Sequence, residues 1–254
     1  GLSNQATNTY STVVGGWINV ASGERAFIGS GYNNLSSGLN SSVVGGNSNT
    51  ASSTGAFVGG GYTNDTGSGG LYNAIVGGLT NVMSGGGDYC FMGGGSGHTS
   101  TAGSYTTICG GFENVASASS AAVCGGSYNE ATGSAAFVGG GQHNDATQAH
   151  ASICGGELNV ASGDGSHIGG GHSNAASAID SCVPGGLSNT AATSYSTAMG
   201  YGATTRNKGE IAQSAGYFTT AGDSQVRRLH LRRQTTNATP VILSDDNVGD
   251  GAGS

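Results

Sequence analysis

The feature that most constrains this chain is an asparagine that returns at a nearly constant interval. The asparagines of this column are Asn19, Asn34, Asn49, Asn64, Asn81, Asn114, Asn129, Asn144, Asn159, Asn174 and Asn189, and His98 takes the place of one more. Successive numbers differ by 15, except for steps of 17, 17 and 16 on the way from Asn64 through His98 to Asn114. A short fixed period is typical of a solenoid, in which each repeat forms one coil stacked on the last.

Each repeat has the same internal order, as the stretch from Ser42 to Asn49 shows: an apolar pair, two or three glycines, and a polar run ending in Asn. Short β-branched or aromatic runs bounded by glycine are typical of strands. Glycine permits the positive φ of a tight corner. The sequence therefore predicts an all-β parallel β-solenoid, or β-roll, of about 13 coils over residues 1–205. A small β segment is expected over residues 206–254.

Aligning the apolar pairs gives two columns, and neighbouring residues of a strand point to opposite faces. The first column holds Val13, Phe27, Val43, Phe57, Ile75, Phe91, Ile108, Val123, Phe137 and Ile153. The second holds Val14, Ile28, Val44, Val58, Val76, Met92, Cys109, Cys124, Val138, Cys154 and Ile168. One face fills the coil, and the other forms an apolar stripe that needs a cover. We expect a homotrimer, because three copies around one axis would bury the stripe.

The alignment leaves an irregularity in its spacing. The second apolar residue precedes the Asn by five positions at Val14 and Val44 but by six at Ile28 and Val58, and Cys109 and Cys124 both take five. One interpretation is a true repeat of two coils. In this alignment Cys109, Cys124 and Cys154 are small buried hydrophobic residues. Cys90 and Cys182 share a separate column with alanines.

Charge is scarce and uneven, which excludes several function classes. Of the 254 residues 51 are Gly and only 8% are charged, and the strict period argues against the disorder that so much glycine could indicate. Arg25 is the only basic residue before residue 200, where nine acids occur, so no nucleic-acid surface is expected. No apolar run is long enough for membrane insertion. The opening residues Gly1-Leu2-Ser3 do not resemble a signal peptide.

Few residues have the spacing of a catalytic pair or of a set of metal ligands. Stacking should bring Glu130 and Asp145 about 5 Å apart, near the separation of a retaining glycosidase pair. A convex turn offers nothing to hold a sugar ring, so we expect a hydrated acidic turn, with a weak cation site as the next alternative and no catalytic residue. His98, His143 and His172 form no metal-ligand pattern, and the glycine runs lack a phosphate-loop lysine. We expect no metal, no cofactor and no enzyme activity.

Five aromatic residues beside the glycine runs are candidate binding residues: Trp17, Tyr32, Tyr62, Phe112 and Tyr128. Rings on the surface of a rod suit the faces of carbohydrates. Packing between subunits would use the same rings equally well, and both interpretations stay open.

Units such as Ser42–Gly46 and Ala198–Ala203 resemble the head domains of trimeric autotransporter adhesins and the related solenoid shafts of bacteriophage tail fibres. The resemblance covers roughly residues 10–205, although this repeat is slightly longer than the family's. It implies a trimeric left-handed parallel β-roll used for attachment. The run from Gly222 to Asp246 is similar to a segment of cyanophage and related phage fibre proteins, which implies a tip or chaperone-like domain beyond it, missing or cleaved.

These observations predict an extracellular, non-enzymatic virion tail fibre: a trimeric rod for host-surface attachment, or a spacer for a receptor-binding tip. Expected partners are a host cell-surface glycan or lipopolysaccharide and other fibre or baseplate proteins. The alternatives are a polysaccharide-depolymerising tailspike and a bacterial surface adhesin head. Arg227, Arg228, Arg232 and Arg233 are expected on a solvated strand face or in a clasp between subunits to acids such as Asp245.

Overall fold

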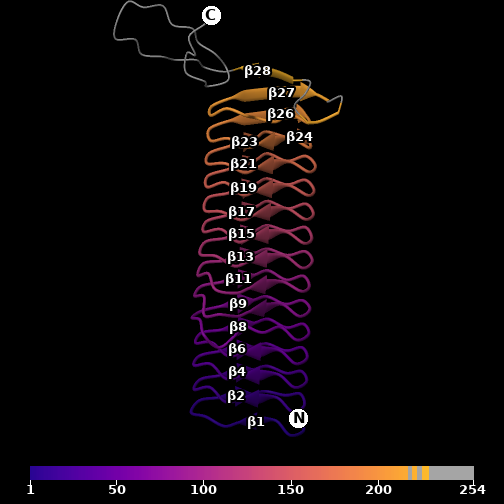
Figure 1. Ribbon diagram of the computed structural model, residues 1–254. Coiled ribbons are helices and arrows are strands. Elements are labelled where there is room, and N and C mark those ends of the chain that lie inside the picture. Colours follow the sequence, from indigo (N-terminus) through magenta and orange to yellow (C-terminus); the bar gives the residue numbers. More distant parts are fainter. Residues whose placement is uncertain (217–218, 222–224, 229–254) are drawn as a thin grey trace, which may run out of the picture.

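The coils stack into one straight rod (Figure 1). The computed structural model describes residues 1–216, 219–221 and 225–228, and this part of the chain contains strands and no helix. It forms a parallel β-solenoid of about 14 turns with a period of about 15 residues, which confirms the predicted fold class with one turn more than expected. None of the described residues forms a helix that could cross a membrane.

Most coils contribute a short strand to each of two walls. We call the wall with 16 strands the long sheet. Its strands are β2 (Thr12–Val13), β4 (Phe27–Ile28), β6 (Ser42–Val43), β8 (Phe57–Val58), β9 (Ala74–Ile75), β11 (Phe91–Met92), β13 (Thr107–Ile108), β15 (Ala122–Val123), β17 (Phe137–Val138), β19 (Ser152–Ile153), β21 (His167–Ile168), β23 (Cys182–Val183), β24 (Gly186–Leu187), β26 (Thr197–Tyr201), β27 (Ile211–Ala215) and β28 (Gln225–Arg228).

The opposite wall consists of two shorter sheets. The first has four strands: β1 (Gln5–Ala6), β3 (Val20–Ala21), β5 (Leu35–Ser36) and β7 (Thr50–Ala51). The second has eight: β10 (Val82–Met83), β12 (Thr99–Ser100), β14 (Val115–Ala116), β16 (Glu130–Ala131), β18 (Asp145–Ala146), β20 (Val160–Ala161), β22 (Ala175–Ala176) and β25 (Thr190–Ala191).

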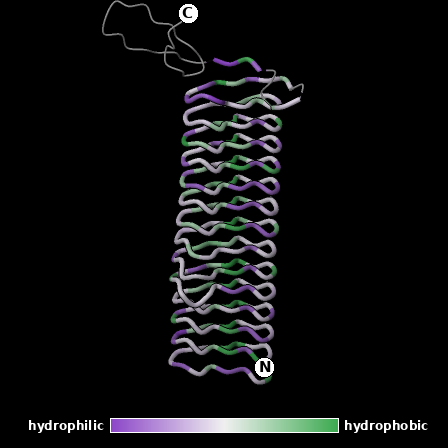
Figure 2. The backbone as a smooth tube through the Cα atoms, viewed as in Figure 1, coloured by the Kyte–Doolittle hydropathy of each residue, from purple (hydrophilic) through white to green (hydrophobic). Residues whose placement is uncertain are grey.

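The core of the rod is one column of fully buried residues from the long sheet facing small residues from the other wall. Ile28 pairs with Val43 and Val43 with Val58, and all three are 0% exposed. Ala21 and Ala51 face them from the opposite wall and are also 0% exposed. The apolar segments recur at the same place on successive coils (Figure 2). So short a coil has room for little more than this double column.

The strand register corrects the two predicted apolar columns. The inward-facing residue always stands six positions before the ladder residue, as the half-buried Val13 and the buried Ile28, Val43 and Val58 do, so neither the alternation nor its irregularity exists in the core. The predicted columns placed Phe27 with Val43, but Phe27 is its coil's outward residue. Val44 is outward as well, so it does not share a column with Val58. Only the outer surface alternates between a Phe before the buried residue and a Val or Cys after it.

The predicted burial of three cysteines is wrong for the same reason. Cys109, Cys124 and Cys154 each follow a buried residue and point outward, and all three are exposed. The prediction that Cys90 and Cys182 share a column is also wrong. Cys182 pairs with His167 on the outer face of the long sheet, whereas Cys90 is buried. None of the five forms a disulfide in this chain.

The regular stack is interrupted between residues 59 and 106. The buried apolar residues divide there into two clusters, one ending at Val58 and the other beginning at Ile75. The short sheets divide at the same place, where Asp65 joins Thr50 and Val82 only by isolated bridges. The three longer coils lie in this segment, and their extra residues widen the turns. We call residues 59–106 the joint.

The long sheet ends, among the described residues, on an antiparallel strand. β27 continues the parallel long sheet, and β28 runs antiparallel to it. Arg227 Nε lies 3.1 Å from Oε1 of Glu210, whose side chain is fully buried. Arg227 therefore pairs with an acid of its own chain. Arg232, Arg233 and Asp245, which were expected on the same strand face or in the clasp, lie outside the described residues.

Candidate functional site

The asparagine column forms a continuous buried ladder along one corner of the rod. At Asn144, Oδ1 accepts the backbone N–H of Asn159 at 3.1 Å and its Nδ2 at 2.9 Å. Nδ2 of Asn144 donates to the carbonyls of Gly140 and Gly156 at 3.0 and 2.8 Å. Each Asn thus satisfies buried backbone groups in its own coil and the next. The ladder begins one coil earlier than the predicted column, because Asn4 accepts from the backbone N–H of Asn19.

The glycines before each Asn are required by the same corner. Gly141 has φ +92°, and a Cβ there would lie 2.8 Å from Nδ2 of Asn144 and would also strike the Gly156 carbonyl. The glycine run therefore keeps the ladder and the next coil close together.

The outward face of the long sheet is free of charged side chains. We call it the uncharged stripe, meaning the residues just before and just after each buried strand residue from Thr12 to Met199. No Lys, Arg, Asp or Glu occupies any of these positions. Its large apolar members are 38–70% exposed: Val14, Phe27, Val44, Phe57, Val76, Phe91 and Phe137. This is where the structure places most of the residues predicted for the core or the trimer interface.

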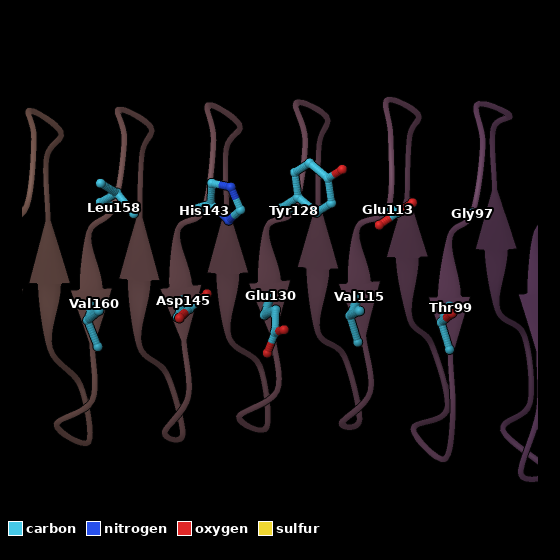
Figure 3. A pocket seen from close by; sticks show the side chains of 10 residues that line it. All are labelled: Gly97, Thr99, Glu113, Val115, Tyr128, Glu130, His143, Asp145, Leu158 and Val160. Atoms are coloured by element: carbon cyan, nitrogen blue, oxygen red, sulfur yellow. The ribbon is translucent and has the colours of Figure 1, made fainter.

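The opposite wall carries a shallow groove across five coils, in which two rows of side chains run along the rod (Figure 3). One row follows the turns and contains Glu113, Tyr128 and His143, and the other follows strands β12 to β20 and contains Glu130 and Asp145. The remaining lining residues are Gly97, Thr99, Val115, Leu158 and Val160, and the groove's volume is about 620 Å³.

Glu130 and Asp145 are register partners on adjacent strands, as the spacing predicts. Partial burial raises the pKa of the Asp145 carboxyl, and the neighbouring Glu130 raises it further, while His143 lowers it. The two residues lie on strands β16 and β18 rather than on the predicted turn, and they line an open groove, which suits hydrogen bonding to a polar ligand.

The five predicted aromatic residues occupy two columns rather than one. Trp17, Tyr32, Tyr62 and Phe112 share a ladder of parallel bridges at one corner, whereas Tyr128 belongs to the next position along the chain, with φ +56°. The rings of Tyr128 and His143 stack in parallel with centroids 4.8 Å apart. Of the five, only Tyr128 lines the groove.

A second aromatic ladder was missed by the sequence reasoning. Tyr72, Tyr89 and Tyr105 stack on the opposite turn with centroids 5.5 Å apart. They are 50–61% exposed. Their spacing of 17 and 16 residues equals the length of the long coils, so the sequence could have predicted that the three rings stack.

No group of three or more His, Cys, Asp or Glu side chains among the described residues is placed to hold a metal ion. His150 and His172 instead lie 3.5 and 3.9 Å from the exposed carboxylates of Asp164 and Glu157. His143 lies in the groove, and His98 is buried in the asparagine ladder.

The fold defines this chain as a parallel β-solenoid protein whose exposed features run as ladders along a rod. No protein-family model matches the chain, and no curated protein matches it in sequence.

Proposed function

We propose that the chain is the shaft of a homotrimeric, extracellular virion fibre that attaches to a host cell-surface glycan or spaces the element that does. The observation that carries the proposal is the uncharged stripe. A face of this length without a single Lys, Arg, Asp or Glu is suited to burial. Three copies facing one axis would cover it.

The stripe also favours a second copy of this chain over any other partner. Its apolar residues recur once per coil, at the rise of one β-strand spacing, about 4.8 Å. A partner stays in register with such a ladder only if it has the same rise. Another copy of the rod meets this condition along its whole length.

Attachment is supported by the groove on the opposite wall, which a trimer built through the stripe leaves open. Carboxylates accept hydrogen bonds from sugar hydroxyls, while Tyr128, Val115 and Leu158 offer apolar contact to the faces of sugar rings. The negative charge of Glu113, Glu130 and Asp145 favours a neutral or amino-substituted glycan over an acidic one.

Light scattering coupled to size-exclusion chromatography tests the assembly. We expect a mass three times that of the 24.6 kDa chain. A folded monomer would overturn the proposal, and a dimer would replace the threefold axis by a twofold one. Isothermal titration with neutral and acidic oligosaccharides tests attachment, and Tyr128→Ala should weaken the binding of the neutral ones without changing the mass.

One observation favours a second function, polysaccharide cleavage: Asp145 has a raised pKa and pairs with Glu130 on the next strand. Release of new reducing ends from host polysaccharide by the wild type, but not by Asp145→Asn, would assign a depolymerising spike instead. We expect no release, because the open groove encloses neither carboxylate.

A further inference from the structure

His98 occupies an asparagine position in the ladder, where it is 0% exposed. Its backbone N–H donates to Oδ1 of Asn81 at 3.1 Å, as an asparagine's does. Its Nδ1 accepts the backbone N–H of Asn114, also at 3.1 Å. Since Nδ1 is the acceptor, the ring proton sits on Nε2.

The Nε2 atom of His98 takes the place of the asparagine amide nitrogen. A Cβ added at Gly95 would strike Nε2, just as one added at Gly16 or Gly31 would strike Nδ2 of the ladder asparagine in that coil. Nε2 is directed to the Gly94 carbonyl but makes no well-formed hydrogen bond. The neutral imidazole is thus an incomplete copy of the amide.

The ladder has fewer hydrogen bonds on both sides of His98, because no neighbouring side chain bonds to the His98 ring, which accepts only a backbone N–H. Elsewhere each Asn Nδ2 donates to Oδ1 of the Asn one coil before, as Asn129 does to Asn114 at 3.2 Å. Nδ2 of Asn114 donates only to the carbonyls of Gly110 and Gly126. His98 also stands at the C-terminal end of the joint, but the break in the core and in the short sheets lies earlier, between Val58 and Ile75, and strands β10, β12 and β14 pair continuously past His98.

We propose that His98 is an acid-sensitive link in the rod: protonation of Nδ1 replaces the acceptor for the Asn114 N–H with a second donor, and the solenoid opens locally between its coil and the next. The change is local, because every other position of the ladder from Asn19 to Asn189 is an amide that does not titrate. The rod is continuous at neutral pH and has one weak coil boundary in acid.

The side chains packed around His98 leave the charged ring without a counter-ion. Asn81 and Asn114 lie above and below it, and the interior of its coil contains Met92 and a hydrogen-bonded pair, Ser100 and Thr106. Among the other titratable groups of its own and the adjoining coils, Tyr89 and Tyr105 stack on the opposite turn beside Asp88, and Cys109 is exposed on the outer face of the long sheet. Cys90 is buried and donates its Sγ–H to the Gly103 carbonyl, and Glu113 is exposed, with its side chain against Gly97.

Burial lowers the pKa of His98 below its usual 6.5, although the contact with the Gly94 carbonyl opposes the shift. When the coil is open, the His98 ring is in water and has its ordinary pKa. The equilibrium constant for local opening is therefore independent of pH above pH 6.5. Below pH 6.5 it rises by about tenfold per pH unit, until the pH falls below the pKa of His98 in the closed rod, where it is constant again. Stability is lost as the pH falls, because the opened form binds the proton more tightly.

Hydrogen exchange read by mass spectrometry tests the proposal on the full chain at pH 8 and pH 5, with rates normalised to an unfolded reference. We expect peptides covering residues 94–116 to lose protection at pH 5 in the wild type, by tenfold or more, while peptides around Asn159 keep it. His98→Asn restores the amide and should abolish the loss. His143→Asn removes an exposed histidine of the groove and should leave the loss unchanged.

Equal behaviour of the wild type and His98→Asn, or uniform loss along the whole rod, would overturn the proposal. If His98→Asn does not fold, His98→Gln provides a second non-titrating amide. The wild type can also test the proposal without a variant, by NMR titration of its labelled histidines. We expect one ring with a pKa below 6.5. A buried ring that becomes charged at or above pH 6.5 while hydrogen-exchange protection stays intact would contradict the proposal.

Discussion

At the scale of the residue, asparagine holds each corner because its short side chain combines a donor and an acceptor. The acceptor receives the backbone N–H of the next coil, and the donor satisfies carbonyls that the glycine corner leaves open. Buried backbone groups without partners are costly, so each ladder position contributes to the junction of two coils.

Asn144→Ala should therefore lower stability by about 3 kcal/mol, since it leaves the N–H of Asn159 and the carbonyls of Gly140 and Gly156 with fewer partners, at about 1–3 kcal/mol per unsatisfied group. Urea denaturation at equal chain concentration measures the change. Gln142→Ala, an exposed site in the same coil, should stay within about 0.5 kcal/mol. Equal urea midpoints for the two variants would mean that the ladder contributes nothing.

At the scale of the element, a two-residue strand sends adjacent side chains to opposite sides of the wall. Val43 is 0% exposed and fills the coil, while Val44, the next residue, is 49% exposed on the uncharged stripe. The same substitution at these neighbours should separate folding of the coil from the proposed assembly of three chains.

Val43→Asp should prevent folding, because it buries an unpaired charge, whereas Val44→Asp should fold and fail to assemble. Circular dichroism reports the β structure, and light scattering reports the mass. Leu39→Asp, at an exposed apolar site outside the stripe, should fold and assemble normally. A trimer formed by Val44→Asp would show that the stripe is not the interface.

At the scale of the whole molecule, a stack of parallel coils has open edges at its ends, and unpaired edges invite further strand addition. The last strand of the described rod is β28, which covers the edge of β27, runs antiparallel to it and is held by the Arg227–Glu210 pair. The other carboxylate oxygen of Glu210 accepts the backbone N–H groups of Arg206 and Asn207, so one buried side chain organises the last turn.

Glu210→Ala should release β28, because it removes the ion-pair partner of Arg227 and leaves the backbone N–H groups of Arg206 and Asn207 without their acceptor, at about 1–3 kcal/mol per unsatisfied group. Trypsin should then cleave after Arg227 at least tenfold faster, since cleavage follows the population of the open form. Glu157→Ala removes an exposed carboxylate on the side of the rod and should not change the rate. An unchanged rate in Glu210→Ala would show that β28 is held by its strand pairing alone.

The sequence by itself determined the period, the parallel stacking and the column of asparagines. In a solenoid every coil has the same local structure, so the residues that this structure requires recur at a fixed interval. It also placed Glu130 next to Asp145, since residues one coil apart are spatial neighbours. The apolar nature of both strand faces followed from the same pattern.

Only the tertiary structure decided which apolar residue points inward. Phe27-Ile28 and Val43-Val44 look alike as pairs, yet the buried member is the second in one and the first in the other. The pairing of the strands fixes the buried residue six positions before the Asn, and a shift of one residue exchanges the two faces. Cys109, Cys124 and Cys154 appeared buried for this reason, and the Glu210–Arg227 clasp depends on a reversal of strand direction that no repeat predicts.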